Sequence, residues 1–175
     1  IAHGAVAAEP ELVLRAAGSL APRLTAASSC LPAFRLHFQS RGAIDNLYVE
    51  PLPAFPALAD SEVLLAVRAV GLNFRDVLNI LGEYPGDPGP PGGDVSGTLV
   101  DSSLSKLHGA PSFGLAHAPL ATTARASASF IACKPALLTF EQACTLPVTW
   151  STTHVALQRA QLQASHRLIV HAAAG

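Results

Sequence analysis

Apolar and polar side chains alternate along several segments of the chain, and this two-residue period predicts strands. Phe34, Leu36 and Phe38 alternate with polar residues, which is typical of a half-buried strand. The same alternation recurs in residues 62–70. Shorter strands are expected at 46–49, at 94–100 and within 113–133. The pattern therefore predicts a β-rich domain that begins near residue 34, after an Ala-, Pro- and Ser-rich stretch with one short strand at 11–15.

A helix is predicted directly after the strand at 62–70. Asn73 has the side chain of a helix N-cap, and Asp76 follows three residues later in the first turn. Gly82 stands where a left-handed residue ends a short helix, and the Pro- and Gly-rich residues 86–93 form a loop. The apolar stripe of this helix consists of Phe74, Val77, Leu78 and Leu81.

Helical signals return after residue 138. Thr139 and Gln142 form a capping box that predicts a short helix, and a second helix is expected over 149–161. The apolar residues 168–170 predict a buried strand, which runs into the small residues 172–175. A strand followed by such a turn is how a dinucleotide-binding βα unit begins. We therefore expect the β-rich domain to give way to an α/β one.

Charge and cysteine usage exclude several classes of site. The net charge is −1 and there is no basic run, so neither nucleic acid nor a membrane surface is expected as a partner. No apolar stretch is long enough to span a bilayer. Cys30, Cys133 and Cys144 form no C-x-x-C pair, so we expect buried free thiols in a reducing cytoplasm rather than disulfides or a zinc site.

Three motifs occur in a characteristic order. Val-Gly-Leu-Asn-Phe-Arg-Asp-Val-Leu at 70–78 is followed by Gly-Glu-Tyr-Pro-Gly at 82–86 and by Val-His-Ala-Ala-Ala-Gly at 170–175. Asp94–Gly97 and Leu146–Thr149 lie between them in the expected order. From residue 34 onward the chain strongly resembles the enoyl reductase domain of type I polyketide synthases. That domain is a relative of the zinc-free quinone oxidoreductases in the medium-chain dehydrogenase/reductase superfamily.

The residues before this region also resemble a synthase. Residues 9–15, with 21–24 after them, look like the segment that precedes the reductase in those synthases. The chain has no methionine and begins at Ile1. We therefore expect a piece of a larger protein in which further cofactor residues, including the general-acid lysine of the family, follow Gly175.

The resemblance implies a mixed β and α/β fold, in which a GroES-like β-barrel domain is followed by the first strand of a Rossmann domain. Residues 1–33 would be linker or the end of the preceding synthase region, and residues 34–138 the GroES-like substrate domain. Residues 139–175 would form the junction helices and the first strand of the NADPH-binding domain. Alone, such a piece is expected to bind NADPH weakly or not at all and to be inactive.

The resemblance also implies a reaction. NADPH would deliver hydride to the β-carbon of an α,β-unsaturated thioester, and the α-carbon would then be protonated. The thioester would hang from the phosphopantetheine arm of an acyl carrier protein, so that domain and the other synthase domains are the expected partners. Two other interpretations stay open: a stand-alone zinc-free quinone oxidoreductase acting on a free small molecule, and a non-catalytic GroES-like module kept for packing.

The resemblance is to the zinc-free branch, so no metal is expected. Zinc-bearing relatives place a cysteine shortly after Gly71 and a histidine in a Gly-His-Glu triplet. Here residues 73–76 read Asn-Phe-Arg-Asp and residues 92–94 read Gly-Gly-Asp, which leaves too few ligands for a tetrahedral site. Asp94 stands where Glu is commoner.

Tyr84 is the predicted catalytic residue. Related reductases carry a tyrosine at this point of the motif, where it is linked to the face on which the α-carbon is protonated. A phenol with a pKa of ~10 can donate that proton or orient a water. From the residues alone, a half-buried tyrosine that closes the Pro/Gly loop explains Tyr84 as well.

Six residues are predicted to bind the cofactor: Asn73, Thr149, Thr153, Ala173, Ala174 and Gly175. Helix capping alone explains Asn73, and a core or capping role explains Thr149 and Thr153 as well. Arg75 and Asp76 are expected to pair with each other or to face solvent, and neither is assigned to catalysis.

One stretch departs from the family pattern. Gly109-Ala110-Pro111-Ser112 replaces the usual Gly-Asp turn, and the proline takes a strand position. A looser turn is therefore expected within residues 101–114.

Overall fold

The computed structural model describes residues 13–15, 18–20, 33–102 and 108–171. The chain divides into two compact units, Ile1–Leu31 and Pro32–Gly175. In the first unit, β1 (Val13–Arg15) pairs antiparallel with β2 (Gly18–Leu20), so that Val13 faces Leu20. The sequence predicted only the first of these strands and assigned the rest to linker, which was wrong at β2. Three residues of strand need a partner for their backbone groups, and β2 provides it.

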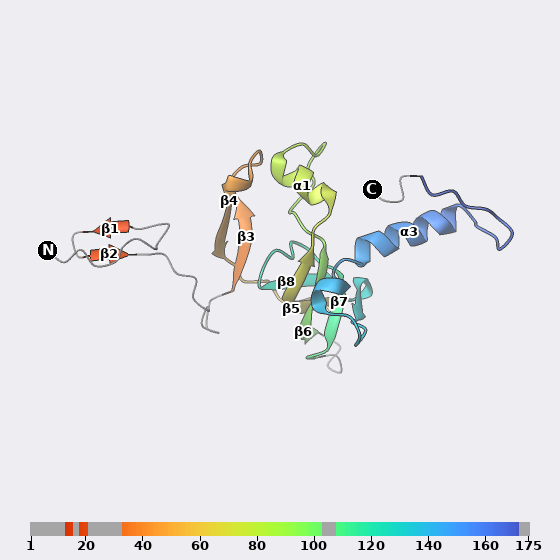
Figure 1. Ribbon diagram of the computed structural model, residues 1–175. Helices are drawn as coiled ribbons and strands as arrows, with labels where there is room; N and C mark the ends of the chain where they lie inside the picture. Colours follow the sequence, from red (N-terminus) through yellow and green to blue (C-terminus); the bar gives the residue numbers. More distant parts are fainter. Residues whose placement is uncertain (1–12, 16–17, 21–32, 103–107, 172–175) are drawn as a thin grey trace. The chain divides into compact units, whose positions relative to one another are not determined.

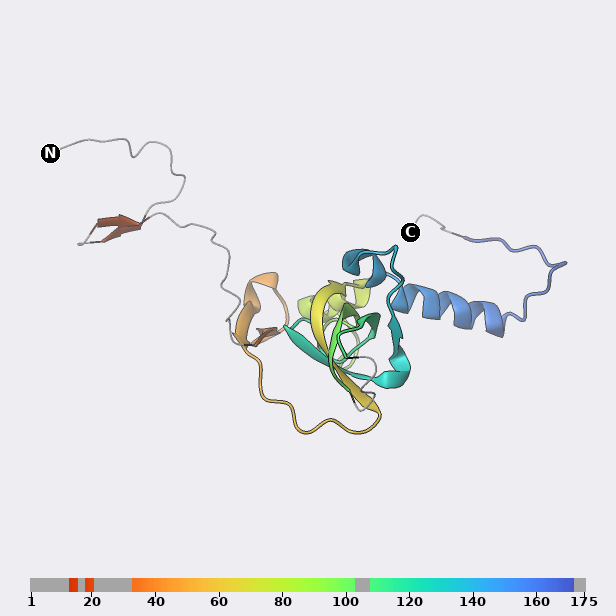
Figure 2. The same ribbon diagram turned by 90° about the horizontal axis from the view of Figure 1, so that it is seen from below.

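The second unit is built on a curled five-stranded antiparallel sheet (Figures 1 and 2). Its strand order is β8-β5-β6-β7-β9, with β5 and β6 as the long inner pair. The register of the β5–β6 pair shifts between Leu64 and Leu65 and again between Val67 and Ala69. The strands are β5 (Glu62–Gly71), β6 (Asp94–Ser102), β7 (Pro111–Leu115), β8 (Thr123–Ser127) and β9 (Ile131–Cys133).

A separate hairpin lies beside this sheet. It consists of β3 (Phe34–Phe38) and β4 (Leu47–Pro51), joined through the short helix η1 (Ile44–Asn46). The backbone N–H of Leu36 donates to the carbonyl oxygen of Leu120 at 2.7 Å, which ties β3 to the segment that precedes β8.

The apolar core lies on one face of the curled sheet. Val63 and Leu65 of β5 are 2% and 0% exposed, and they pack with Leu99 of β6 and Ala126 of β8. The alternation read from the sequence thus matches the buried face in the first half of β5, whereas Val67 and Ala69 are half-buried beside a register shift. Ile131 of β9 packs against the same cluster.

The helices follow the predicted signals closely. α1 (Phe74–Leu81) ends at Gly82, whose φ of 74° is left-handed as the sequence predicted. α2 (Phe140–Ala143) has the expected capping box: the Thr139 hydroxyl accepts from the Gln142 N–H at 3.2 Å, and the Gln142 side chain accepts from the Thr139 N–H at 3.0 Å. α3 (Pro147–Arg159) begins and ends two residues earlier than expected, because Pro147 is well suited to the first helical position.

α2 packs against the inner strands β5 and β6, and α3 contacts β6 and β7. Gly71, the last residue of β5, makes the approach of α2 possible. A Cβ atom at Gly71 would lie 2.2 Å from the carbonyl oxygen of Cys144, the residue that follows α2. The contact therefore requires a residue without a side chain.

The strand predicted at 168–170 is not formed. Leu168, Ile169 and Val170 have no regular secondary structure and are 60%, 90% and 64% exposed. A parallel strand needs neighbouring strands for its backbone groups and apolar cover on both faces. The described residues place neither beside this segment.

The turn that departs from the family pattern is closed by hydrogen bonds at its described end. Gly109 donates to the carbonyl oxygen of Leu99 at 2.7 Å, and Leu99 donates back to Ala110 at 3.1 Å. Pro111 is tolerated because it is the first residue of β7. The expected looseness is absent here, and residues 103–107 lie outside the described part.

Candidate functional site

The motif at residues 70–78, which follows from the end of β5 into α1, places a buried carboxylate inside the first turn of α1. Asp76 is 2% exposed. One of its oxygens accepts the backbone N–H of Asn73 at 2.8 Å, and the other accepts the N–H of Gly92 at 2.8 Å. Asp76 therefore fastens the start of α1 to the loop that precedes β6. The expectation that Asp76 faces solvent or pairs with Arg75 was wrong, because these backbone donors take both oxygens.

Asp94 joins three elements at one point. It is 2% exposed at the start of β6. One carboxylate oxygen accepts the side-chain amide N–H of Asn73 at 3.1 Å, and the other accepts the backbone N–H of Val148 at 3.0 Å. The ends of β5, β6 and α3 therefore meet at this carboxylate. We call Asn73, Asp94 and Val148 the Asp94 junction.

Burial raises the pKa of Asp94 above its ordinary value, and the nearby Asp76 charge acts in the same direction. The hydrogen bonds from Asn73 and Val148 oppose this shift. The position at the N-terminus of α3 also favours a negative charge, because the unpaired N–H groups of the first turn point toward it. The carboxylate is thus costly to bury and is held by donors from two other elements.

Thr149 and Thr153 lie one turn apart on the same face of α3, and both are exposed. Their hydroxyls donate to backbone carbonyls of the preceding turn, Thr149 to Thr145 at 3.3 Å and Thr153 to Thr149 at 2.9 Å. The hydroxyl oxygens keep lone pairs that can accept a further hydrogen bond. Neither threonine is a core residue.

Tyr84 is half-buried in the turn that follows α1. Its backbone N–H donates to the carbonyl oxygen of Leu78 at 3.2 Å, and the guanidinium of Arg75 lies 5.5 Å from the centre of its ring. Within the described residues, no group hydrogen-bonds the phenol oxygen. The hydroxyl is therefore available to a water or to a ligand.

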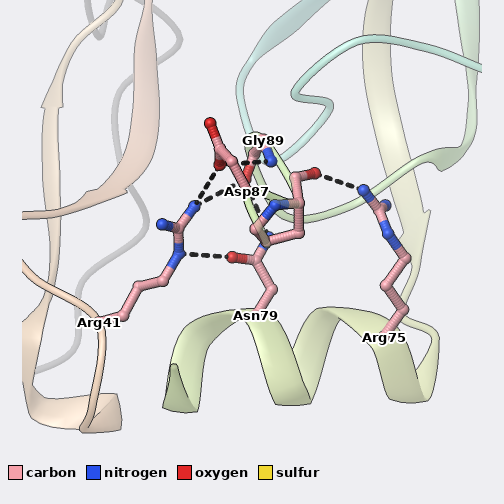
Figure 3. A network of polar contacts seen from close by, with 6 residues as sticks. Arg41, Arg75, Asn79, Asp87 and Gly89 are labelled. Carbon is pink, nitrogen blue, oxygen red and sulfur yellow. Dashed lines mark hydrogen bonds and ion pairs between the residues drawn. The ribbon is translucent and has the colours of Figure 1, made fainter. Parts of the chain in front are cut away.

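Two arginines reach the loop after Tyr84 from opposite sides (Figure 3). Arg41 donates to the side-chain oxygen of Asn79 at 2.8 Å, and to both the Asp87 carboxylate and the Gly89 carbonyl at 3.2 Å. Asn79, which is fully buried, donates to the same carbonyl at 3.0 Å. On the other side, Arg75 donates to the carbonyl oxygen of Pro88.

Sequence reasoning missed this network. Arg41 lies 38 residues before Asn79 along the chain, so no local spacing connects them. The nearest signal was the Asp87-x-Gly89 pattern, in which the Gly89 N–H donates to the Asp87 carboxylate at 3.0 Å. This backbone bond, with Arg41 beside it, lowers the pKa of Asp87.

The structure brings some of the predicted site residues together and leaves others apart. Asn73 contacts Asp94, which in turn binds the residue before Thr149. Between described residues, no hydrogen bond, ion pair or ring contact joins Tyr84 to Asn73, Thr149 or Thr153. Ala173, Ala174 and Gly175 lie outside the described residues.

Two cavities lie near these residues. One, of about 380 Å³, is lined by Arg41, Asp87, Gly89 and His117 among others. The second, of about 330 Å³, is apolar and lies at the start of α3 beside Phe130, Pro147 and Trp150. Neither is lined by Tyr84 or Thr149, so neither is a complete active-site pocket.

The described residues contain no cluster of three or more His, Cys, Asp or Glu side chains that could hold a metal ion. Among the predicted buried thiols, Cys144 is buried and its pKa is raised by burial, whereas Cys133 is exposed on the short edge strand β9. Cys30 lies outside the described residues. In the part of the chain that the structure describes, no helix is long and apolar enough to cross a membrane.

Comparison with curated proteins finds polyketide synthases, although no family model matches the chain. The phenolphthiocerol synthesis polyketide synthase type I Pks15/1 of Mycobacterium marinum is 35% identical over 187 residues, which cover 95% of this chain and 8% of that protein. The spectinabilin polyketide synthase system protein NorB of Streptomyces orinoci is 37% identical over 180 residues, with the same coverage of 95% and 8%. The chain thus spans less than a tenth of the length of these relatives.

Comparison with solved structures finds reductases. CurK enoyl reductase matches with a TM-score of 0.68 and 32% identity, over 75% of this chain and 44% of that chain. Mycobacterial Rv1454c complexed with NADPH matches with a TM-score of 0.62 over 78% of this chain and 41% of that chain, and at 24% identity it shows the fold alone. The quinone oxidoreductase of Coxiella burnetii matches with a TM-score of 0.65 over 76% and 46%, also at 24% identity.

These findings confirm the fold class, because the curled antiparallel sheet and the helices after it match the CurK enoyl reductase. The chain is a homologue of the polyketide synthases, and its described part has the fold of the enoyl reductases and quinone oxidoreductases of the medium-chain dehydrogenase/reductase superfamily.

Proposed function

We propose that this chain is the first part of an enoyl reductase domain within a polyketide synthase. The domain would reduce the double bond of an α,β-unsaturated acyl thioester carried by an acyl carrier protein. The observation that carries the proposal is the match to CurK enoyl reductase at 32% identity over 75% of this chain, together with synthase relatives that cover 95% of it.

NADPH is the proposed reductant, and the described residues fit part of it. Thr149 and Thr153 are exposed on one face of α3 and can accept hydrogen bonds. Asn73 donates one side-chain N–H to Asp94 and keeps the second, since an amide nitrogen carries two. These groups suit a carboxamide such as that of nicotinamide, whereas the residues proposed for the phosphates, Ala173, Ala174 and Gly175, lie outside the described part.

When bound, NADPH supplies the hydride for the β-carbon. In the proposed reaction, the role of Tyr84 is to protonate the α-carbon or to orient the water that does so. Its accessible phenol oxygen and its place on an anchored loop support this role. The Asp94 junction holds the start of α3, and with it Thr149, against the end of β5.

The proposed partners are the acyl carrier protein and the other domains of the same synthase. The synthase relatives support this proposal, because this chain corresponds to less than a tenth of each of them. The synthase matches cover 95% of this chain and therefore include residues before β3. A stand-alone quinone oxidoreductase would not need that segment, so the matches favour the synthase. The proposed location is the cytoplasm.

The test uses the intact polypeptide that carries this sequence. Oxidation of NADPH is measured as the loss of its absorbance, with a crotonyl thioester of pantetheine as the substrate. A parallel assay uses a quinone as the substrate. We expect turnover of the thioester and a loss of about 10²-fold or more in kcat for Tyr84→Phe, the usual contribution of a positioned proton donor. Turnover of the quinone alone, or an unchanged Tyr84→Phe variant, would contradict the proposal.

A further inference from the structure

Arg75 is the side chain that contacts the Tyr84 ring. Its guanidinium lies over the ring at 5.5 Å from the centre, and it also donates to the carbonyl oxygen of Pro88. Arg75 is in the first turn of α1, directly before Asp76, which is bonded to the backbone of both Asn73 and Gly92. A firmly held helix end therefore contacts the tyrosine and the loop that follows it.

Tyr84 has one side-chain interaction within the described residues, its ring contact with Arg75. It lies between Gly82 and Gly86, which both have positive φ. Its backbone is bonded to Leu78, but no described residue hydrogen-bonds its phenol oxygen. Proton delivery to one face of a carbon requires a fixed donor, and small displacements of a reacting group are costly.

Arg41 provides an internal comparison. It holds the same loop through Asp87 and Gly89, and its guanidinium lies over the Phe38 ring rather than over Tyr84. Figure 3 shows Arg41 and Arg75 on opposite sides of the loop. If Tyr84 only requires that its loop be held in place, loss of either arginine should disturb it. If Arg75 orients the Tyr84 ring directly, loss of Arg75 should have the larger effect.

We propose that Arg75 is a positioning residue that orients the Tyr84 phenol and thereby decides which face of the α-carbon is protonated. This inference rests on the proposed function, in which Tyr84 delivers that proton. The planar guanidinium can stack on the ring and donate to Pro88 at the same time, which a lysine ammonium cannot do in the same geometry.

The test uses the intact polypeptide with NADPH and a 2-methylcrotonyl thioester, whose reduction creates a stereocentre at the α-carbon. The measured quantities are kcat, KM and the ratio of the two product epimers. The variants are Arg75→Met, Arg75→Lys, Arg41→Met and Tyr84→Phe, and Arg68→Met serves as an exposed-arginine control on β5. Hydrogen exchange of α1 peptides reports whether each variant is folded.

For Arg75→Met we expect the epimer ratio to shift by between about twofold and about fivefold, the range for loss of a cation–π contact at an exposed site such as Arg75. KM should change little, because the side chain acts through Tyr84 rather than on the substrate. Arg75→Lys should recover part of the selectivity, and it keeps the test informative if the methionine variant does not fold. Arg41→Met should shift the ratio less than Arg75→Met, and Arg68→Met should leave it unchanged.

Three outcomes are adverse and can be told apart. An unchanged ratio in both Arg75 variants, with a changed ratio in Tyr84→Phe, would overturn this inference and leave the proposed function standing. An equal effect of Arg41→Met would also overturn it, because the loop as a whole would then place Tyr84. A Tyr84→Phe variant with wild-type rate and ratio would overturn the proposed role of Tyr84 and the inference with it.

Discussion

Replacing Asp94 by alanine tests whether the Asp94 junction holds α3 to the sheet. The substitution removes the acceptor for the Asn73 side chain and for the Val148 N–H, which bind at 3.1 Å and 3.0 Å. A fully buried donor left without a partner costs about 1–3 kcal/mol, and these two donors are half-buried, so each is expected to cost less than the upper value. Asp94 is only 2% exposed, so water cannot easily replace the lost carboxylate.

An opposing effect reduces the expected loss. Burial raises the pKa of Asp94, which means that the cost of burying its charge exceeds the gain from its hydrogen bonds. The alanine variant no longer carries that cost. We therefore expect a net loss of local stability of about 1–3 kcal/mol, at the lower end of what two unpaired donors would give.

The assay is hydrogen exchange followed by mass spectrometry on the intact polypeptide. In peptides that cover the first turns of α3, exchange should accelerate between about fivefold and about 150-fold, because each 1.4 kcal/mol corresponds to about tenfold. Asp87→Ala is the matched control: its carboxylate binds Arg41 and Gly89, but its side chain is 84% exposed. Exchange in α3 that is unchanged in Asp94→Ala, or equally fast in both variants, would refute the reasoning.

Two further predictions concern titration and thiol reactivity. Burial raises the pKa of Asp94 above its ordinary 3.8, so the folded protein binds this proton more tightly than the unfolded chain does. The contribution of the protonated carboxyl to folding stability is therefore complete below pH 3.8 and is lost as pH rises through the raised pKa. Hydrogen exchange of β6 and α3 peptides measures the local stability of wild type relative to Asp94→Asn. This difference should fall as pH rises over that window, and an increase would contradict the raised pKa of Asp94. In the intact polypeptide, iodoacetamide should label the exposed Cys133 at least about tenfold faster than the buried Cys144, because burial raises the pKa of the Cys144 thiol. Equal labelling of the two cysteines in peptide maps would contradict this prediction.

Local signals in the sequence were enough to place the sheet and the helices. The two-residue alternation over residues 62–70 located β5, Glu62–Gly71, to within one residue. The capping box at Thr139 and the left-handed Gly82 are also local, because each involves residues within one turn. Such features depend on neighbouring residues alone, so a single sequence contains them.

The contacts that build the site were not predictable in this way. Asp94 binds Val148, which lies 54 residues later, and Arg41 binds Asn79, which lies 38 residues later. Only the tertiary fold brings such pairs together. The strand predicted at 168–170 was wrong for a different reason. The local sequence favours a strand, but a strand forms only where another strand is present to pair with it.

The role proposed for Tyr84 comes from family resemblance, and the structure adds what surrounds it. The sequence could not show that Arg75 lies over its ring, because residues nine apart in a helix and a following turn have no fixed geometry. The location of Tyr84 on a loop held from two sides is a property of the fold.

The most direct test of the central claim is transfer of label from the cofactor to the substrate. The intact polypeptide is incubated with a crotonyl thioester and with NADPH that carries deuterium at both C4 positions of the nicotinamide. The product is examined by mass spectrometry and NMR. The proposed function predicts one deuterium at the β-carbon and a solvent-derived proton at the α-carbon. A product without deuterium, or cofactor oxidation without any reduced thioester, would contradict the assignment of this chain to an enoyl reductase.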